Sequence, residues 1–187
     1  MIRQFDIAVI GGGIMGCGAA LQMAKGGMRT VLLDQGDLCQ GASGVNAGTL
    51  SLQIKRVKLM PYALRGHDEW KRMGQEVEFR ETGGFTLAFN EREAALLRER
   101  MAMKRDAGAP ISFVSPSEVA TREPGLSRKI VDASWCPADG FANSSLTGRY
   151  FRHRLVAAQV DLRERCPVTV IRRDGSGFLV ETPTGQI

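Results

Sequence analysis

The chain opens with two short apolar runs separated by a stretch of small and apolar residues. The first run, at residues 5–10, contains Ile7, Val9 and Ile10, and the second occupies residues 30–33. Both are rich in β-branched residues, which is typical of strands buried on both faces of a parallel sheet. A glycine-rich turn at residues 11–16 starts the stretch between them, and Gly26-Gly27 ends it. The pattern predicts a strand, a helix and a second strand.

Beyond residue 50 the pattern is mixed. Helical spacing of apolar positions predicts helices at residues 59–73, from Asn90 to about residue 105, and from Asn143 towards residue 158. A shorter helix is expected after Ser115, because Ser115-Pro116-Ser117-Glu118 has a capping-box spacing, as does the start at Asn90 with Glu93. Strands are expected at residues 83–89, 130–135, around 162, 168–171 and 178–181.

This order is not a continued alternation of strands and helices. It predicts an α/β fold in which a nucleotide-binding domain at residues 1–80 is interrupted by an α+β segment at 81–160 and resumes at 161–187. Residues 182–185 are expected to form a hairpin turn, after which Gln186-Ile187 would open a further strand. An edge without its partner is a liability. We therefore expect the amino-terminal part of a longer protein, a truncated product, or a fragment that needs a partner subunit.

The glycine turn has the spacing of a dinucleotide-binding motif. Gly11 permits the sharp turn, Gly13 lets the backbone approach a pyrophosphate, and Gly16 lets the helix pack on the strand. The unpaired N–H groups at the helix start attract an anion without a basic side chain. Asp34 follows the second strand, where its carboxylate can bind ribose hydroxyls and would repel the 2′-phosphate of NADP. NAD and FAD both remain open on this motif.

Composition and charge narrow the classes of protein. The 187 residues are 43% hydrophobic, enough for one good core or two small ones. The net charge is +5, but the basic runs alternate with acidic residues and lack aromatic residues between them, which argues against a nucleic-acid partner. The sequence has no transmembrane run and no room for a signal peptide before the first strand, so a cytoplasmic location is expected.

The four cysteines and two histidines do not have the spacing of metal ligands. Cys17, Cys39, Cys136 and Cys166 lie far apart in the sequence, and neither His67 nor His153 has a partner at ligand spacing. We therefore expect no metal site and four ordinary thiols.

Several stretches together resemble one protein family. They are the glycine motif at residues 7–16, Val31-Leu32-Leu33-Asp34, the small-residue loop at 41–48, and the segments at 81–88 and 137–143. The sequence resembles the amino-terminal half of the D-amino-acid oxidase family of FAD-dependent amine and amino-acid oxidoreductases, of the glycine oxidase, sarcosine oxidase, opine oxidase and hydrogen cyanide synthase type. The resemblance implies a Rossmann-like, glutathione-reductase-like FAD-binding domain interrupted by a substrate domain.

The resemblance also implies which residues bind FAD. Ile14 and Met15 would give backbone N–H groups to the pyrophosphate, and Asp34 would hold the adenosine ribose beside Gln35. The loop after Gly41 would run along the pyrophosphate, the ribityl chain and the flavin, and the backbone of Val168 would contact adenine. The full implied set is Gly11, Gly13, Ile14, Met15, Gly16, Asp34, Gln35, Ala42, Ser43, Asn46, Ala47, Gly48, Thr49 and Val168.

The activity that the resemblance implies is oxidation of the C–N bond of a small amine or amino acid, with hydride passing to flavin N5. The family's carboxylate-binding side chain lies mainly in the second half, so no catalytic residue is named in this chain. We expect the 187 residues alone to bind FAD weakly or not at all and to show no turnover. Two alternatives remain: an NAD-dependent dehydrogenase, which has no need of the 43–49 loop, and a non-catalytic fragment that binds a dinucleotide.

Overall fold

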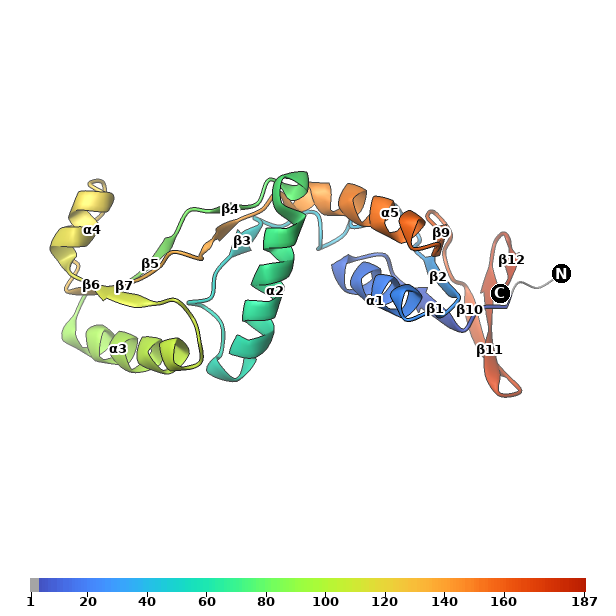
Figure 1. The fold of residues 1–187 in the computed structure, drawn as a ribbon, viewed down its shortest axis with the longest axis horizontal. Helices are drawn as coiled ribbons and strands as arrows, with labels where there is room; N and C mark the ends of the chain where they lie inside the picture. Colours follow the sequence, from blue (N-terminus) through green and yellow to red (C-terminus); the bar gives the residue numbers. More distant parts are fainter. Residues whose placement is uncertain (1–3) are drawn as a thin grey trace. The chain divides into compact units, whose positions relative to one another are not determined.

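The computed structural model describes residues 4–187 (Figure 1). The chain divides into two compact units, one formed by Met1–Ala47 with Asn143–Ile187 and the other by Gly48–Ala142. The domain limits expected from the sequence were residues 80 and 160. The assignment of a cofactor domain and a substrate domain to particular ranges stays a prediction.

The first unit contains a three-stranded parallel sheet. Its strands are β1 (Ile7–Ile10), β2 (Thr30–Leu33) and β9 (Asp161–Arg163), in the order β1-β2-β9. Helix α1 (Ile14–Lys25) connects β1 to β2 and packs against both. The strand, helix and strand expected at the start of the chain are therefore present, and the two strands are parallel as predicted.

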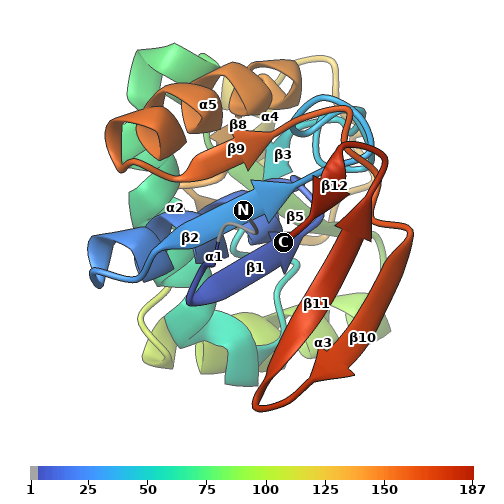
Figure 2. The ribbon, with the colours of Figure 1, turned by 90° about the vertical axis from the view of Figure 1, so that its right-hand side faces the viewer.

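The central strand β2 is covered on both sides, as Val31, Leu32 and Leu33 show by being fully buried. The expectation of burial on both faces is wrong for β1, which lies at the edge of the sheet and alternates half-buried with exposed residues, with Ile10 49% exposed. Helix α5 (Thr147–Ala157) packs against α1 and β9, after a 3-10 turn at Ser144–Leu146. A second, antiparallel sheet consists of β10 (Val170–Asp174), β11 (Gly177–Thr182) and β12 (Gly185–Gln186). Figure 2 shows these strands beside β1, β2 and β9.

The core between the two sheets is built from side chains of both. The buried residues of this cluster are Val31, Leu33, Cys166, Val180 and Ile187, with Phe5 and Val168 packed against them. Because consecutive strand residues point to opposite faces, Val31 and Leu33 lie on this side, and Leu32 faces the other. The first unit thus has three layers: helices, parallel sheet and antiparallel sheet.

The second unit contains two further sheets of three strands. Strands β5 (Gly84–Ala88), β7 (Asp132–Cys136) and β6 (Ser112–Val114) form one, in the order β5-β7-β6, and every neighbouring pair is antiparallel. The other joins β3 (Thr49–Leu50), β8 (Gly140–Phe141) and β4 (Arg80–Glu81). The helices are α2 (Met60–Met73), α3 (Glu91–Asp106) and α4 (Pro116–Arg122), with 3-10 turns at Val57–Leu59 and Gly74–Val77.

Helix starts in the second unit follow the expected capping residues with one difference. Ser115 forms a complete capping box with Glu118 at the start of α4. At the start of α3, the Asn90 side chain accepts the Glu93 N–H at 3.0 Å, but the Glu93 carboxylate accepts the N–H of Phe89. In a capping box the Glu93 carboxylate would accept the N–H of Asn90; it accepts the N–H of the preceding residue instead. A backbone donor before the helix is still satisfied.

Candidate cofactor site

The glycine turn joins β1 to α1, and close backbone approaches explain its composition. Gly11 has a φ of +105°, which residues with a side chain rarely adopt. A Cβ on Gly16 would lie 1.8 Å from the Gly11 carbonyl oxygen, and a Cβ on Gly12 would lie 2.4 Å from Leu38 Cδ2. Glycine is therefore required at Gly16 by the close backbone and at Gly11 by its φ, whereas the contact at Gly12 is with the end of a flexible side chain.

The start of α1 offers backbone donors without a competing acidic side chain. Its N-cap is Gly13, which makes no side-chain cap, and the first turn carries no acidic residue. The Ile14 N–H donates to Ser43 Oγ at 3.0 Å, and Met15 is 84% exposed. A helix start with these properties favours an anion, and the Ser43 hydroxyl lies where that anion would be bound.

The Asp34 carboxylate, at the carboxyl end of β2, contacts the glycine turn directly. Asp34 Oδ2 accepts the Gly12 N–H at 2.5 Å, and Oδ1 accepts the Gly36 N–H at 2.7 Å. Each oxygen retains a further lone pair that can accept a hydroxyl hydrogen. Gln35, the next residue, is exposed. The carboxylate is thus held in one orientation beside the turn, with capacity left for ribose.

The loop that follows is held by its own polar groups. Asn46 Nδ2 donates to the carbonyl oxygens of Ala42 at 2.9 Å and Ser43 at 3.1 Å. Ser144 Oγ donates to the carbonyl oxygen of Asn46 at 2.9 Å and also approaches that of Gly44 at 3.2 Å. Ala42 and Ala47 are exposed. This ordered, small-residue surface contrasts with the flexible loop that the composition alone would also permit.

Ser144 and Gly12 were not singled out as site residues from the sequence. Gly12 N–H binds Asp34, and its carbonyl oxygen accepts the Cys39 N–H at 2.9 Å. Its place as the middle glycine of three was the only signal that could have marked it. Ser144 belongs to the Asn143-Ser144-Ser145 triplet expected to start a helix, and nothing in the sequence connects it with residues a hundred positions earlier.

The remaining implied residues lie in different surroundings. Gly48 and Thr49 belong to the second unit, where Gly48 has a φ of +67°, the Gly48 carbonyl accepts the Ala142 N–H at 3.0 Å, and Thr49 is paired with Phe141 in the β3–β8 ladder. Val168 lies in the first unit before β10, which begins at Val170, two residues later than the strand start expected from the sequence. The Val168 side chain packs into the core between the sheets.

Glu164 connects the loop after β2 to α5. Its Oε1 accepts the Leu38 N–H at 2.7 Å and the Arg152 Nη2 at 2.6 Å, and its Oε2 accepts the Arg152 Nε at 2.8 Å. The Arg152 guanidinium and the Leu38 N–H hold the pKa of this carboxyl below its usual range. Because Leu38 also packs on Gly12, this ion pair supports the loop that carries the site.

A buried polar network follows β3 in the second unit. Asp139 Oδ1 accepts the Leu52 N–H at 2.7 Å, and Asp139 Oδ2 accepts from Ser51 Oγ at 2.5 Å and from Gln53 Nε2 at 3.1 Å. The Gln53 carbonyl accepts from the buried Lys104 ammonium, whose pKa is lowered chiefly by desolvation. The network fixes the chain directly after Gly48 and Thr49.

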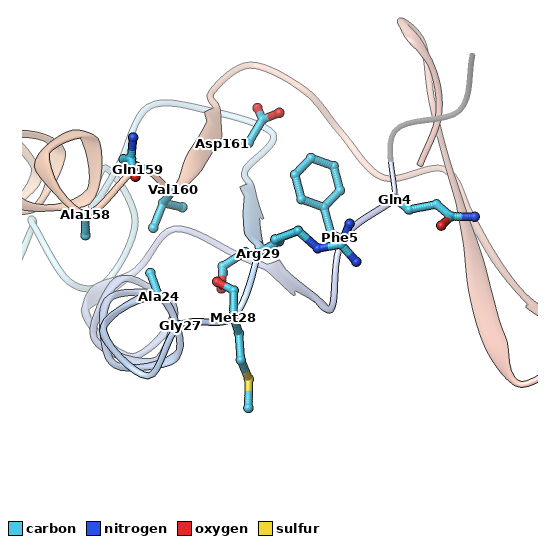
Figure 3. A pocket seen from close by; sticks show the side chains of 11 residues that line it. Gln4, Phe5, Ala24, Gly27, Met28, Arg29, Ala158, Gln159, Val160 and Asp161 are labelled. Carbon is cyan, nitrogen blue, oxygen red and sulfur yellow. The ribbon is translucent and has the colours of Figure 1, made fainter.

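A cavity of about 550 Å³ lies in the first unit, at the amino ends of the parallel strands. Figure 3 shows residues that line it, including Phe5 just before β1 and Asp161 at the start of β9. Ligands of open parallel sheets bind beyond the carboxyl ends of the strands. The glycine turn and Asp34 lie at the carboxyl ends of β1 and β2, so this cavity does not belong to the candidate cofactor site.

Candidate metal clusters and membrane-spanning helices are both absent from residues 4–187, the part of the chain that the structure describes. Within that range, no group of three or more His, Cys, Asp or Glu side chains is arranged to hold a metal ion. None of the helices found there has the length and apolar character needed to span a bilayer.

The geometry is typical of a class of protein: α/β proteins that bind a dinucleotide with a glycine turn, a helix start and an acidic residue after the next strand. The sequence profile of one family matches residues 6–187 of the chain. The chain belongs to this family, the FAD dependent oxidoreductases of the DAO type.

Individual relatives agree with the family match. The chain is 27% identical over 197 residues to glycine oxidase of Geobacillus kaustophilus (strain HTA426), covering 99% of this chain and 52% of the relative. It is 31% identical over 156 residues to an opine oxidase subunit of Rhizobium meliloti, covering 75% of this chain and 42% of that protein. The crystal structure of the Geobacillus kaustophilus glycine oxidase superposes with a TM-score of 0.86 at 27% identity, over 100% of this chain and 53% of that one.

Three expectations are confirmed by these comparisons: the family resemblance, the α/β fold and FAD as the family's cofactor. The NAD-dependent alternative is not favoured. The chain spans about half the length of the curated relatives that it matches. A Cβ at Gly13 would lie 3.1 Å from Ser43 Oγ, so the absence of a side chain there is compatible with a close approach of the backbone to a phosphate.

Proposed function

We propose that this chain forms part of an FAD-dependent enzyme that oxidises the C–N bond of a small amine or amino acid. The observation that carries the proposal is the Asp34 carboxylate, which is bound to the N–H of Gly12 within a glycine turn of the FAD dependent oxidoreductase family. Such a carboxylate favours a ribose without a 2′-phosphate. The names of two relatives, a glycine oxidase and a subunit of an opine oxidase, support an amino-acid or amine substrate.

We propose FAD contacts along the segments described above. The first turn of α1, with Ile14 and Met15, would bind the pyrophosphate, and Ser43 Oγ would exchange its hydrogen bond with Ile14 for one with a phosphate oxygen. Asp34 would accept the ribose hydroxyls, with Gln35 exposed beside it. The loop residues Ala42, Asn46, Ala47, Gly48 and Thr49 would present backbone to the cofactor, and Val168 would present its carbonyl or N–H to adenine.

The chemistry that FAD supplies when bound is acceptance of a hydride from the carbon that carries nitrogen. The residues of this chain would bind and orient the cofactor, the first turn of α1 at the pyrophosphate and Asp34 at the ribose. No residue of this chain is assigned a proton-transfer role. The substrate-binding side chain is proposed to lie in a second half of the fold, whether on the same polypeptide or on a partner subunit.

Two expectations about the whole protein remain part of the proposal. Since relatives of this chain are about twice its length, we predict that the 187 residues alone bind FAD weakly or not at all and do not turn over substrate. A cytoplasmic location also stays a prediction.

The proposed function is tested with purified protein that carries this chain together with the remaining half of the family fold. We expect the protein to be yellow with bound FAD, and its flavin absorbance to bleach without oxygen when one of a panel of small amino acids and N-methylated amines is added. The 187-residue chain is assayed in parallel. Copurification of NAD instead of FAD, or no bleaching by any amine, would contradict the proposal.

A further inference from the structure

Two cysteine thiols lie beneath the glycine turn and approach the same atom. The Sγ atoms of Cys17 and Cys39 lie 3.3 Å and 3.6 Å from the carbonyl oxygen of Gly12. Cys17 is on α1, whereas Cys39 is in the loop after β2 and has a left-handed backbone with a φ of +58°. Both residues are buried and neither is in a disulfide. The proposed function uses neither thiol.

The surroundings make the two sulfurs chemically different. The neighbouring Cys17 thiol, and after it the Thr147 hydroxyl, lower the pKa of Cys39 to about 7 despite its burial. Thr147 begins α5, so the sulfur also lies near a helix start, where a thiolate is favoured. The pKa of Cys17 is raised, chiefly by the neighbouring Cys39 sulfur and by burial. The pair thus places a nucleophilic sulfur and a second thiol beside the same carbonyl oxygen.

Access for a small oxidant comes from the exposed side of the loop. Cys39 is 4% exposed, and the residues that follow it, Gln40 and Gly41, are exposed. Loop openings of this kind cost little free energy compared with global unfolding. A small molecule therefore needs only a local opening of this loop to reach Cys39.

We propose that Cys17 and Cys39 form a reversible disulfide beneath the glycine turn when the protein meets a peroxide. The Cys39 thiolate attacks one peroxide oxygen, the O–O bond breaks, and the departing hydroxide takes up a proton as water, leaving a sulfenic acid on Cys39. The Cys17 sulfur then attacks the Cys39 sulfur, the S–O bond breaks, and hydroxide leaves with the Cys17 proton as a second water. Two thiols are oxidised and one peroxide is reduced.

The disulfide changes what surrounds the Gly12 carbonyl. The Cys17 sulfur loses the hydrogen that it donates to this oxygen, and α1 becomes covalently joined to the loop after β2. Gly12 lies between the two connections, since its N–H is bound by Asp34. The oxidation state of the pair therefore acts on the same turn that is proposed to bind the pyrophosphate, although the disulfide itself does not depend on which substrate the enzyme uses.

The test maps disulfides in the 187-residue chain after treatment with hydrogen peroxide. Free thiols are blocked with N-ethylmaleimide during unfolding, and trypsin then releases Cys17 in residues 4–25 and Cys39 in residues 30–55. We expect these two peptides to be linked, and the link to disappear after dithiothreitol. The link should form at least about tenfold faster than any link that involves Cys136, whose pKa is raised to about 12.

Variants separate the proposed pair from general oxidation. Cys17→Ser and Cys39→Ser should each abolish the link, and Cys136→Ser, at a buried thiol of the second unit, should leave it unchanged. Should the first two variants fail to fold, the unsubstituted chain treated with peroxide in urea provides the comparison, because a link that depends on the fold forms more slowly there. Separately blocked Cys17 and Cys39 peptides, a sulfinic acid on Cys39 without a link, or equal rates in urea would each overturn the proposal.

Discussion

At the scale of single residues, Asp34 combines a structural and a binding role in one carboxylate. Its two oxygens accept the N–H groups of Gly12 and Gly36, which come from the turn before α1 and from the loop after β2. Ionised acceptors make stronger hydrogen bonds than neutral ones. The carboxylate therefore positions the backbone on both sides of the proposed ribose site before any ligand arrives.

We predict that Asp34→Asn weakens both the fold and FAD binding. The amide would place an N–H₂ group against one of the two backbone N–H donors, so about 1–3 kcal/mol of stability is expected to be lost. The FAD dissociation constant should rise by about tenfold, the equivalent of one charged hydrogen bond to ribose. Urea unfolding and equilibrium dialysis of the protein that carries the full family fold measure the two effects.

Asp37→Asn is the matched control, since Asp37 lies close to Asp34 in the chain but forms an exposed ion pair with Arg165 at 3.0 Å. Exposed pairs contribute little. Equal effects of the two substitutions on FAD affinity would show that Asp34 has no special role.

Gly16 and Gly18 provide a second pair on one helix. An alanine Cβ at Gly16 would lie 1.8 Å from the Gly11 carbonyl oxygen, whereas a Cβ at Gly18 would meet no atom within 4 Å. We predict that Gly16→Ala destabilises the chain by more than about 2 kcal/mol through backbone displacement, and that Gly18→Ala stabilises it by about 0.5–1 kcal/mol through helix propensity. Urea unfolding of both variants measures the effects, and a neutral result for Gly16→Ala would contradict the close approach of α1 to the turn.

At the scale of elements, Glu164 connects β9, α5 and the loop after β2. We predict that Glu164→Gln costs about 2 kcal/mol at neutral pH, because a neutral amide replaces an ionised acceptor between Arg152 and the Leu38 N–H. The pKa of Glu164 is lower in the folded chain than its ordinary value of 4.5. Its stabilisation is therefore complete above about pH 4.5 and is lost as the pH falls through the lower folded pKa.

Urea unfolding at pH 7 and pH 3 tests the Glu164 prediction. The difference between the original chain and Glu164→Gln should shrink at the lower pH. Glu99→Gln, at an exposed position on α3, should show no such pH-dependent difference. A gap of the same size at both pH values would mean that ionisation of Glu164 does not stabilise these elements.

The longer elements could be predicted from the sequence, but the shortest strands could not. The β-branched run at Thr30–Leu33 and the capping signal at Ser115 are local, and the structure has a strand and a helix at these places. Strands β3, β4 and β8 each have two residues, which is too short for an alternating pattern to be visible. Their existence depends on partners far along the chain, such as Thr49 opposite Phe141.

The candidate site shows the same division between local and distant information. The order of the glycine turn and Asp34 could be found from spacing alone, and their proposed roles as FAD contacts stay predictions. The bond from Ile14 N–H to Ser43 Oγ and the support from Ser144 could not be predicted, because each joins residues that no sequence period relates. The approach of Cys17 and Cys39 to one carbonyl belongs to the same category.

At the scale of the whole molecule, the Asp139 network lies entirely within Gly48–Ala142. We predict that Asp139→Ala destabilises this unit by about 3 kcal/mol, because the buried Leu52 N–H and Gln53 amide lose their acceptor. Amide hydrogen exchange should accelerate in Gly48–Ala142. Asp106→Ala, at the exposed end of α3, should leave exchange there unchanged. Similar exchange in both variants would show that the network does not stabilise the unit.

The chain leaves the first unit after Ala47 and returns to it at Asn143. In each unit, a hydrogen bond connects residues near the two points where the chain crosses. Within the second, the N–H of Ala142 donates to the Gly48 carbonyl, so its two ends are neighbours. Within the first, Ser144 binds the carbonyl of Asn46. An insertion whose ends meet costs its host little loop-closure entropy, whatever its length. The middle segment therefore has the attributes of an exchangeable cassette, one that can grow or shrink between its ends while Met1–Ala47 and Asn143–Ile187 keep their fold.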